Sequence, residues 1–153
     1  MWAITKQERS LGFLPSENSY KVNVDGSSFG NPSRLGFGGL IRNNLGEWIS
    51  GFSGFCGIAS NLHAGLLAIF HGLNLSWSSG FKAIICESDS QLALTLIAKG
   101  LDRFHPHEPV INKIRNFMYF PWSLTLNHTL RETNECADWL AKHGAANDLH
   151  LFR

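Results

Sequence analysis

Three aspartates stand where predicted elements of the chain end or begin. Asp25 closes a short alternating run, Asp89 follows an apolar run, and Asp138 lies in the first turns of a predicted helix. In an open α/β sheet, residues that follow the carboxyl ends of neighbouring strands meet at one edge. Clustered carboxylates repel one another unless cations neutralise them. Because hard divalent cations prefer oxygen ligands, the three aspartates predict a Mg2+ site.

Each aspartate also has a simpler explanation. Asp25 precedes a glycine, and Asp-Gly is a common turn. Asp89 directly precedes a predicted helix, where an aspartate can act as a cap. Asp138 fits the solvent-exposed face of a helix. The order of the elements therefore decides between one shared site and three unrelated positions.

Alternation of apolar and polar residues predicts the strands. In the run Tyr20–Gly26, Val22 and Val24 fall on one face and Asp25 on the other, because side chains alternate along a strand. Short turns rich in glycine and asparagine join the first three strands, which are therefore predicted to be antiparallel. Further strands are expected at 35–42, 48–55, 81–86 and 122–128.

A helical period of apolar residues predicts four helices, at about 60–77, 90–99, 110–119 and 134–143. Gly80, Gly100 and Gly144 are expected to end three of them. The order is three strands, a helix, a strand, two helices, a strand and a helix. A mixed α/β fold follows, in which the later strands are parallel because long crossovers connect them.

Composition predicts one compact domain. The chain has 153 residues with 44% hydrophobic content, enough for a single core. Its formal charge of +1 offers no general attraction for a polyanion, so nucleic-acid binding would require a local patch. We expect residues 1–19 to be a leader or linker that packs weakly if at all, 20–146 to be the domain, and 147–153 to be a tail.

The chain also predicts an intracellular setting, in the cytoplasm or the nucleus. Its three cysteines include no Cys-x-x-Cys pair, which is typical of a reducing compartment. The longest helical apolar run, Leu66–Phe70, is far shorter than the roughly 18 residues that a membrane span needs. No basic and then apolar leader opens the sequence, so no secretory signal is expected. The oligomeric state stays open.

Several motifs, taken together, resemble one known family. The segment Val22–Ser27 reads VNVDGS, and the stretches GNP at 30–32 and GFGGLIR at 36–42 follow it. These residues resemble retroelement-type ribonuclease H domains of the reverse-transcriptase-like, plant non-LTR kind. The block Glu87–Gln91 is similar to that family's second aspartate block, and 128–138 is similar to its closing block. The resemblance covers about residues 20–144.

The resemblance implies a ribonuclease H-like fold, with a five-stranded mixed sheet flanked by helices. It also implies endonucleolytic cleavage of the RNA strand of RNA/DNA hybrids, with two Mg2+ ions held by an Asp-Glu-Asp-Asp set and Mn2+ as a substitute. Asp25, Asp89 and Asp138 match the three aspartates of that set, as catalytic residues and metal ligands. Two such ions clamp the scissile phosphate, one activating the attacking water and one stabilising the leaving oxygen.

Three further positions take a role from the resemblance. His128, ten positions before Asp138, matches the family's mobile histidine, which aids proton transfer or product release. Asn61 and Gln91 match positions that contact the hybrid near the cut, and amides suit recognition of 2'-hydroxyl groups and the minor groove. A strand-end position for His128, and a cap or exposed position for each amide, are the alternatives.

Residue 65 departs from the family's pattern. The family has its glutamate ligand on the first helix in an Ala-Glu-Leu context, and this chain has Ala64-Gly65-Leu66. Gly65 shares the inward face of the predicted helix with Ile69, and glycine within a helix costs about 1 kcal/mol relative to alanine. Either the ligand has been lost, or glycine permits a close contact between helix and sheet.

We expect loss of the ligand and severely reduced cleavage. Glu87, on the same strand as Asp89, would replace the missing ligand only if the geometry allows it. The alternative functions are a catalytically inactive domain that binds or tethers nucleic acid, and a protein-interaction module that binds none.

Overall fold

Six strands form one mixed sheet, and the computed structural model places them in the order β1-β6-β5-β2-β3-β4. The structure describes residues 2–6, 18–29, 34–57, 60–100 and 105–147. The three strands β2, β3 and β4 pair antiparallel, and β5 and β6 continue the sheet in parallel beyond β2. Their bounds are β2 (Tyr20–Phe29), β3 (Arg34–Arg42), β4 (Trp48–Gly57), β5 (Ala83–Ser88) and β6 (Ser123–His128). The mixed α/β class and all five expected strands are confirmed, but β2 continues to Phe29, so the expectation that Asp25 closes its strand is wrong.

The sixth strand comes from the segment that was expected to be a leader. Strand β1 (Trp2–Lys6) pairs in parallel with β6, from Trp2 opposite Leu124 to Lys6 opposite His128. The expectation of a weakly packed leader is therefore wrong for these five residues, and the sheet has six strands instead of five. Five residues without a sustained period gave no strand signal, and the backbone pairing with β6 supplies what the pattern lacked. Residues 7–17 of the expected leader, and 148–153 of the expected tail, lie outside the described residues.

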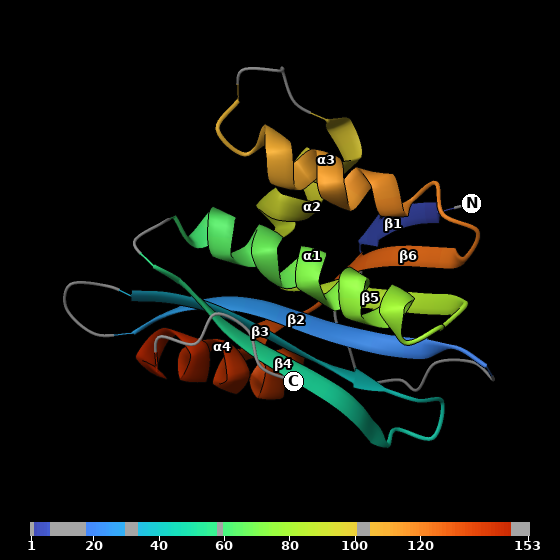
Figure 1. The fold of residues 1–153 in the computed structure, drawn as a ribbon, viewed down its shortest axis with the longest axis horizontal. Coiled ribbons are helices and arrows are strands. Elements are labelled where there is room, and N and C mark those ends of the chain that lie inside the picture. The colour runs from blue at the N-terminus through green and yellow to red at the C-terminus, as the bar shows by residue number, and fades with distance from the viewer. Residues whose placement is uncertain (1, 7–17, 30–33, 58–59, 101–104, 148–153) are drawn as a thin grey trace.

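Helices cover both faces of the sheet. Figure 1 shows α1, α2 and α3 on one side and α4 on the other, and α4 packs against β2, β3 and β4. A 3-10 turn, η1 (Arg131–Asn134), leads directly into α4. The bounds of the four helices are α1 (Asn61–Ser78), α2 (Gln91–Lys99), α3 (Glu108–Phe117) and α4 (Glu135–Asn147).

Glycines set how closely the helices approach the sheet. Val22 and Val24 of β2 are fully buried beneath α1, and a Cβ atom added to Gly72 would lie 2.8 Å from Cγ1 of Val24. On the opposite face, Gly144 was expected to end the last helix, but α4 continues past it to Asn147. A Cβ at Gly144 would collide with the backbone of Gly54 in β4, so this glycine serves close packing and does not stop the helix.

Within the described ranges, no helix has both the length and the apolar character needed to cross a membrane.

Candidate active site

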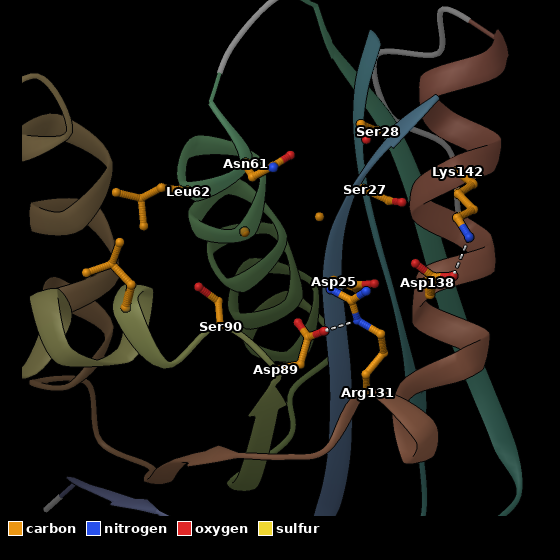
Figure 2. A pocket seen from close by; sticks show the side chains of 13 residues that line it. Asp25, Ser27, Ser28, Asn61, Leu62, Asp89, Ser90, Arg131, Asp138 and Lys142 are labelled. Atoms are coloured by element: carbon orange, nitrogen blue, oxygen red, sulfur yellow. Dashed lines mark ion pairs between the residues drawn. The ribbon is translucent and has the colours of Figure 1, made fainter. Parts of the chain in front are cut away.

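A cavity of about 630 Å³ lies at the carboxyl end of β5, beside the second half of β2, and residues of α1 and α4 contribute to its lining. Asp25, Asp89 and Asp138 all line it, and Figure 2 shows their side chains pointing into the same space. Gly65 and Asn61 line its α1 side. Five of the seven predicted site positions are therefore brought together at one cavity.

The pairing of β2 with β5 explains why Asp25 and Asp89 meet. The two strands run parallel with Val24 opposite Ser88, so the residue that follows each pair emerges at the same edge. A small turn then fixes Asp89: the Ser90 N–H donates to Oγ of Ser88 at 3.1 Å. Oγ of Ser90 in turn caps α2 by accepting from the N–H of Ala93 at 3.2 Å.

Gly26 brings α1 to the cavity. A Cβ atom at Gly26 would lie 2.6 Å from the carbonyl carbon of Ala64 and 2.6 Å from the backbone nitrogen of Gly65, which is closer than real Cβ atoms come. Glycine at position 26 therefore allows the first turns of α1 to lie directly on β2, next to Asp25. Residue 65 is held beside the strand that carries Asp25.

Asn134 fixes the side of the cavity that η1 and α4 form. Its side-chain Nδ2 donates a 2.8 Å hydrogen bond to the carbonyl oxygen of Val24, and the residue is only 1% exposed. This contact fastens η1 to β2 at the residue before Asp25. Arg131 and Asp138, which flank Asn134 in sequence, are thereby placed at the cavity.

The environments of the carboxyl groups differ. Burial, together with the neighbouring charges and hydrogen bonds of Asp89 and Asp138, raises the pKa of Asp25 to about 9. Burial alone would raise the pKa of Asp138 as well, but hydrogen bonds with Lys142, Asp25 and Ser27 and the charge of Lys142 hold it below its usual range. The shared environment therefore moves the pKa values of Asp25 and Asp138 apart, upward for Asp25 and downward for Asp138.

Two basic side chains share the cavity with the aspartates. Nε of Arg131 lies 3.5 Å from Oδ2 of Asp89, and Nζ of Lys142 lies 3.0 Å from Oδ2 of Asp138. Both pairs are drawn as dashed lines in Figure 2. Sequence reasoning missed these residues, although the spacing of Lys142 four residues after Asp138 on a helix is a recognised signal for an ion pair.

Gly65 faces open space. The nearest atoms to a Cβ added there are Cβ and Oγ of Ser90, at 3.7 and 3.8 Å, which is ordinary van der Waals contact. Close approach between α1 and the sheet depends on Gly26 and Gly72 instead. The packing explanation for Gly65 therefore fails, and a longer side chain at this position would enter the cavity beside Ser90.

Glu87 does not line the cavity, so it supplies no carboxylate beside position 65. Its side chain is 2% exposed, accepts a 2.9 Å hydrogen bond from Nδ2 of Asn23 and lies 3.6 Å from Nζ of Lys21. Arg42 extends this buried network by donating to Oδ1 of Asn23 at 3.0 Å. Glu87 is absent from the cavity lining, and its carboxylate is committed to these partners.

Two predicted residues lie apart from the cavity lining. Gln91 is exposed at the start of α2, where its Nε2 lies 3.4 Å from Oγ1 of Thr95. His128 ends β6 and is half-buried, opposite Ser88 of β5. Neither residue contributes to the lining, so their predicted roles rest on resemblance.

The donor set fits a pair of divalent ions only in part. Asp25, Asp89 and Asp138 offer carboxylate oxygens around one space, but position 65 offers none. Throughout the described part of the chain, no three His, Cys, Asp or Glu side chains are gathered closely enough to form a ready metal site. The cavity is one ligand short of the acidic set that the sequence motifs imply.

The reverse transcriptase-like family matches residues 23–144, a stretch that includes every strand from β3 to β6 and all three aspartates. The chain belongs to the reverse transcriptase-like family. It is also 32% identical over 148 residues to an Arabidopsis thaliana protein named "Putative ribonuclease H protein". That match covers 95% of this chain but only 24% of the relative, so the chain spans about a quarter of that protein's length.

Solved structures place this member of the reverse transcriptase-like family in the ribonuclease H-like fold. RNase H1 of the archaeon Halobacterium salinarum superposes with a TM-score of 0.75 at 25% identity, covering 84% of this chain and 98% of that one. LC11-RNase H1 from a compost metagenome, solved in complex with an RNA/DNA hybrid, gives a TM-score of 0.70 at 22% identity over 83% of this chain and 96% of its own. The expected ribonuclease H-like fold is confirmed.

Proposed function

We propose that the cavity is the active site of a ribonuclease H-type endonuclease that acts on the RNA strand of RNA/DNA hybrids and depends on Mg2+. The observation that carries the proposal is the meeting of Asp25, Asp89 and Asp138 around the open space at residue 65. Divalent ions held by these aspartates would activate water and stabilise the leaving oxygen. Membership of the family and the hybrid bound to LC11-RNase H1 support the choice of substrate.

The same proposal includes a severe loss of activity in this chain. Replacing one ligand of a two-ion site by a residue without donor atoms leaves the ions poorly held, because binding and geometry depend on the number of oxygen ligands. Glu87 cannot compensate while it is buried against Asn23 and Lys21. The unmodified chain is therefore expected to cleave hybrids weakly in either Mg2+ or Mn2+.

Cleavage of a labelled RNA/DNA hybrid by Gly65→Glu tests the proposal. The space beside Ser90 accommodates a longer side chain, so Glu at position 65 is expected to restore Mg2+-dependent cleavage. Adding Asp25→Asn to Gly65→Glu should abolish the gain, and Gly65→Gln, which is nearly the same size but uncharged, is the matched control. Equal cleavage by the unmodified chain and Gly65→Glu would refute the assignment of residue 65.

A second function, binding or tethering of nucleic acid without cleavage, is favoured by a separate observation. Arg131 and Lys142 already neutralise two of the three aspartates at the cavity. A chain without hybrid binding even at low salt would contradict both functions, and would favour a protein-interaction module.

We also propose that the domain works inside the cell, in the cytoplasm or the nucleus. Cys56, Cys86 and Cys136 form no disulfide in the structure. Unpaired thiols are typical of a reducing compartment.

A further inference from the structure

Arg131 and Lys142 flank the aspartates of the cavity on two sides. In Figure 2, Arg131 reaches Asp89 from η1, while Lys142 reaches Asp138 from the next turn of α4. Asp25 lies between the two pairs in the same view. The cavity thus contains two positive charges of its own, in contact with the outer aspartates of the acidic set.

Arg131 lies on the side of the cavity where position 65 provides no ligand. Gly65 supplies no oxygen ligand on the side of Ser90 and Asp89, so a divalent ion there would have few protein contacts. Arg131 is tied to Asp89 on that side. Charge compensation that metals would provide in a complete site comes here from the chain itself.

Both cations also retain free donor capacity toward solvent. The side chain of Arg131 is 85% exposed and that of Lys142 is 54% exposed, while Asp89 and Asp138 are 15% and 29% exposed. A guanidinium has five N–H donors and an ammonium has three, and each ion pair uses only part of them. Each side chain can therefore contact its aspartate and an incoming phosphate at the same time.

We propose that Arg131 and Lys142 form a metal-independent clamp for the phosphodiester backbone of a nucleic-acid strand at this cavity. The inference rests on the proposed function for its substrate, but it assigns binding to the cations of the chain instead of to bound metal. Arg131 contacts one phosphate beside Asp89, and Lys142 contacts another beside Asp138. The binding is electrostatic, so it depends strongly on salt and weakly on sequence.

Binding of a short fluorescently labelled RNA/DNA hybrid, measured by anisotropy with EDTA and with Mg2+ at matched ionic strength, tests the clamp. The full chain is expected to bind in EDTA at least as tightly as in Mg2+. Arg131→Ala and Lys142→Ala are each expected to weaken binding in EDTA about tenfold, because each removes a charged hydrogen bond to phosphate. Each should also lower the slope of log affinity against log salt by about 1.

Two further variants separate a phosphate contact from a structural or general charge effect. Lys142→Arg keeps the charge and should retain most of the affinity. Lys99→Ala removes an equal charge at the exposed end of α2 and should leave binding nearly unchanged. Loss of binding in EDTA, or equal affinities for Lys142→Ala, Arg131→Ala and Lys99→Ala, would overturn the proposal.

The outcome is independent of the cleavage test. Cleavage restored by Gly65→Glu, together with a hybrid affinity that Arg131→Ala and Lys142→Ala leave unchanged, would support the nuclease assignment and reject the clamp. Binding in EDTA that depends on both cations, without any cleavage by Gly65→Glu, would support the clamp and reject the nuclease assignment.

Discussion

Gly65 and Ser90 face one another across open space at the rim of the cavity, where a Cβ on residue 65 would lie 3.7 Å from Cβ of Ser90. No packing requirement explains a glycine at this place in the second turn of α1. Glycine there costs helix stability and removes a side chain that would point toward the aspartates. The space around residue 65 therefore does not require glycine, which agrees with our proposal that a ligand is missing at this position.

Gly65→Ala is expected to stabilise the protein. The new methyl group meets no close neighbour, and alanine is preferred over glycine within a helix by about 1 kcal/mol. Urea denaturation should show this increase in the free energy of unfolding. Gly72→Ala is the matched control in the same helix: its methyl group would lie 2.8 Å from Cγ1 of Val24, so it should destabilise. Destabilisation by Gly65→Ala as large as that by Gly72→Ala would restore the packing explanation.

Glu87→Gln is expected to destabilise the protein without affecting divalent-ion binding at the cavity. The change removes the carboxylate opposite Lys21 in a buried network, and breaking a buried ion pair costs roughly 3 kcal/mol. Thermal unfolding measures the first effect, and calorimetric titration with Mn2+ at a temperature where the variant is folded measures the second. A loss of Mn2+ binding with little loss of stability would make Glu87 a metal ligand.

Asp25→Asn is expected to stabilise the metal-free protein at pH 8. The pKa of Asp25 is raised from 3.8 to about 9, so the folded state keeps a proton that the unfolded chain releases. The free energy of unfolding therefore falls as pH rises between these two values, and asparagine removes this loss. We expect an increase of at least about 1 kcal/mol, or roughly 2–4 °C in Tm.

The same variant should respond less to divalent ions. If Mg2+ binds the cavity of the folded state as proposed, it raises the Tm of the unmodified protein, and Asp25→Asn lacks one of the carboxylates proposed to hold it. Thermal melts in EDTA and in Mg2+ at several pH values measure both effects. A lower Tm for Asp25→Asn in EDTA at pH 8 would show that the three carboxyl groups do not repel one another.

The three cysteines are expected to react with an alkylating reagent in a fixed order. Cys136 is exposed on α4 and should react first. Burial raises the pKa of the half-buried Cys56 to about 11, so its rate should continue to increase up to that pH. Cys86 is buried in β5, where burial also raises its pKa, and should react only on unfolding. Peptide mass spectrometry after timed alkylation measures the order, and early labelling of Cys86 would contradict the packing of β5.

The sequence predicted the parts of the fold that carry strong local patterns. Alternating residues and turn signals predicted β2, β3, β4 and β6, an apolar run predicted β5, and the helical apolar period predicted α1 to α4, because these elements bury one face or both. Strand β1 was missed, since five residues that gain their pairing from β6 have no pattern of their own. Gly144 was misread as a helix stop because glycine serves both helix ends and close contacts, and only the position of Gly54 distinguishes the two.

The candidate site, like the fold, was predicted only in part from the sequence. The three aspartates were found because the sequence pattern placed Asp25 and Asp89 after strands and Asp138 near the start of a helix. In the structure Asp25 lies within β2, which continues to Phe29, and the parallel pairing of β2 with β5 brings it to Asp89. The ion pairs of Arg131 and Lys142 depend on how η1 and α4 lie against β2, which the bond from Asn134 to Val24 fixes. The hydrogen bond that Glu87 accepts from Asn23 likewise depends on the strand register, which places the two residues opposite one another.

The rate of hybrid cleavage by Gly65→Glu relative to the unmodified chain, in Mg2+ and under single-turnover conditions, tests the central claim most directly. The account predicts a large gain in rate that Asp25→Asn abolishes and that Gly65→Gln does not reproduce. No gain, or a gain that survives Asp25→Asn, would contradict the assignment of residue 65 as the missing ligand position of a ribonuclease H site.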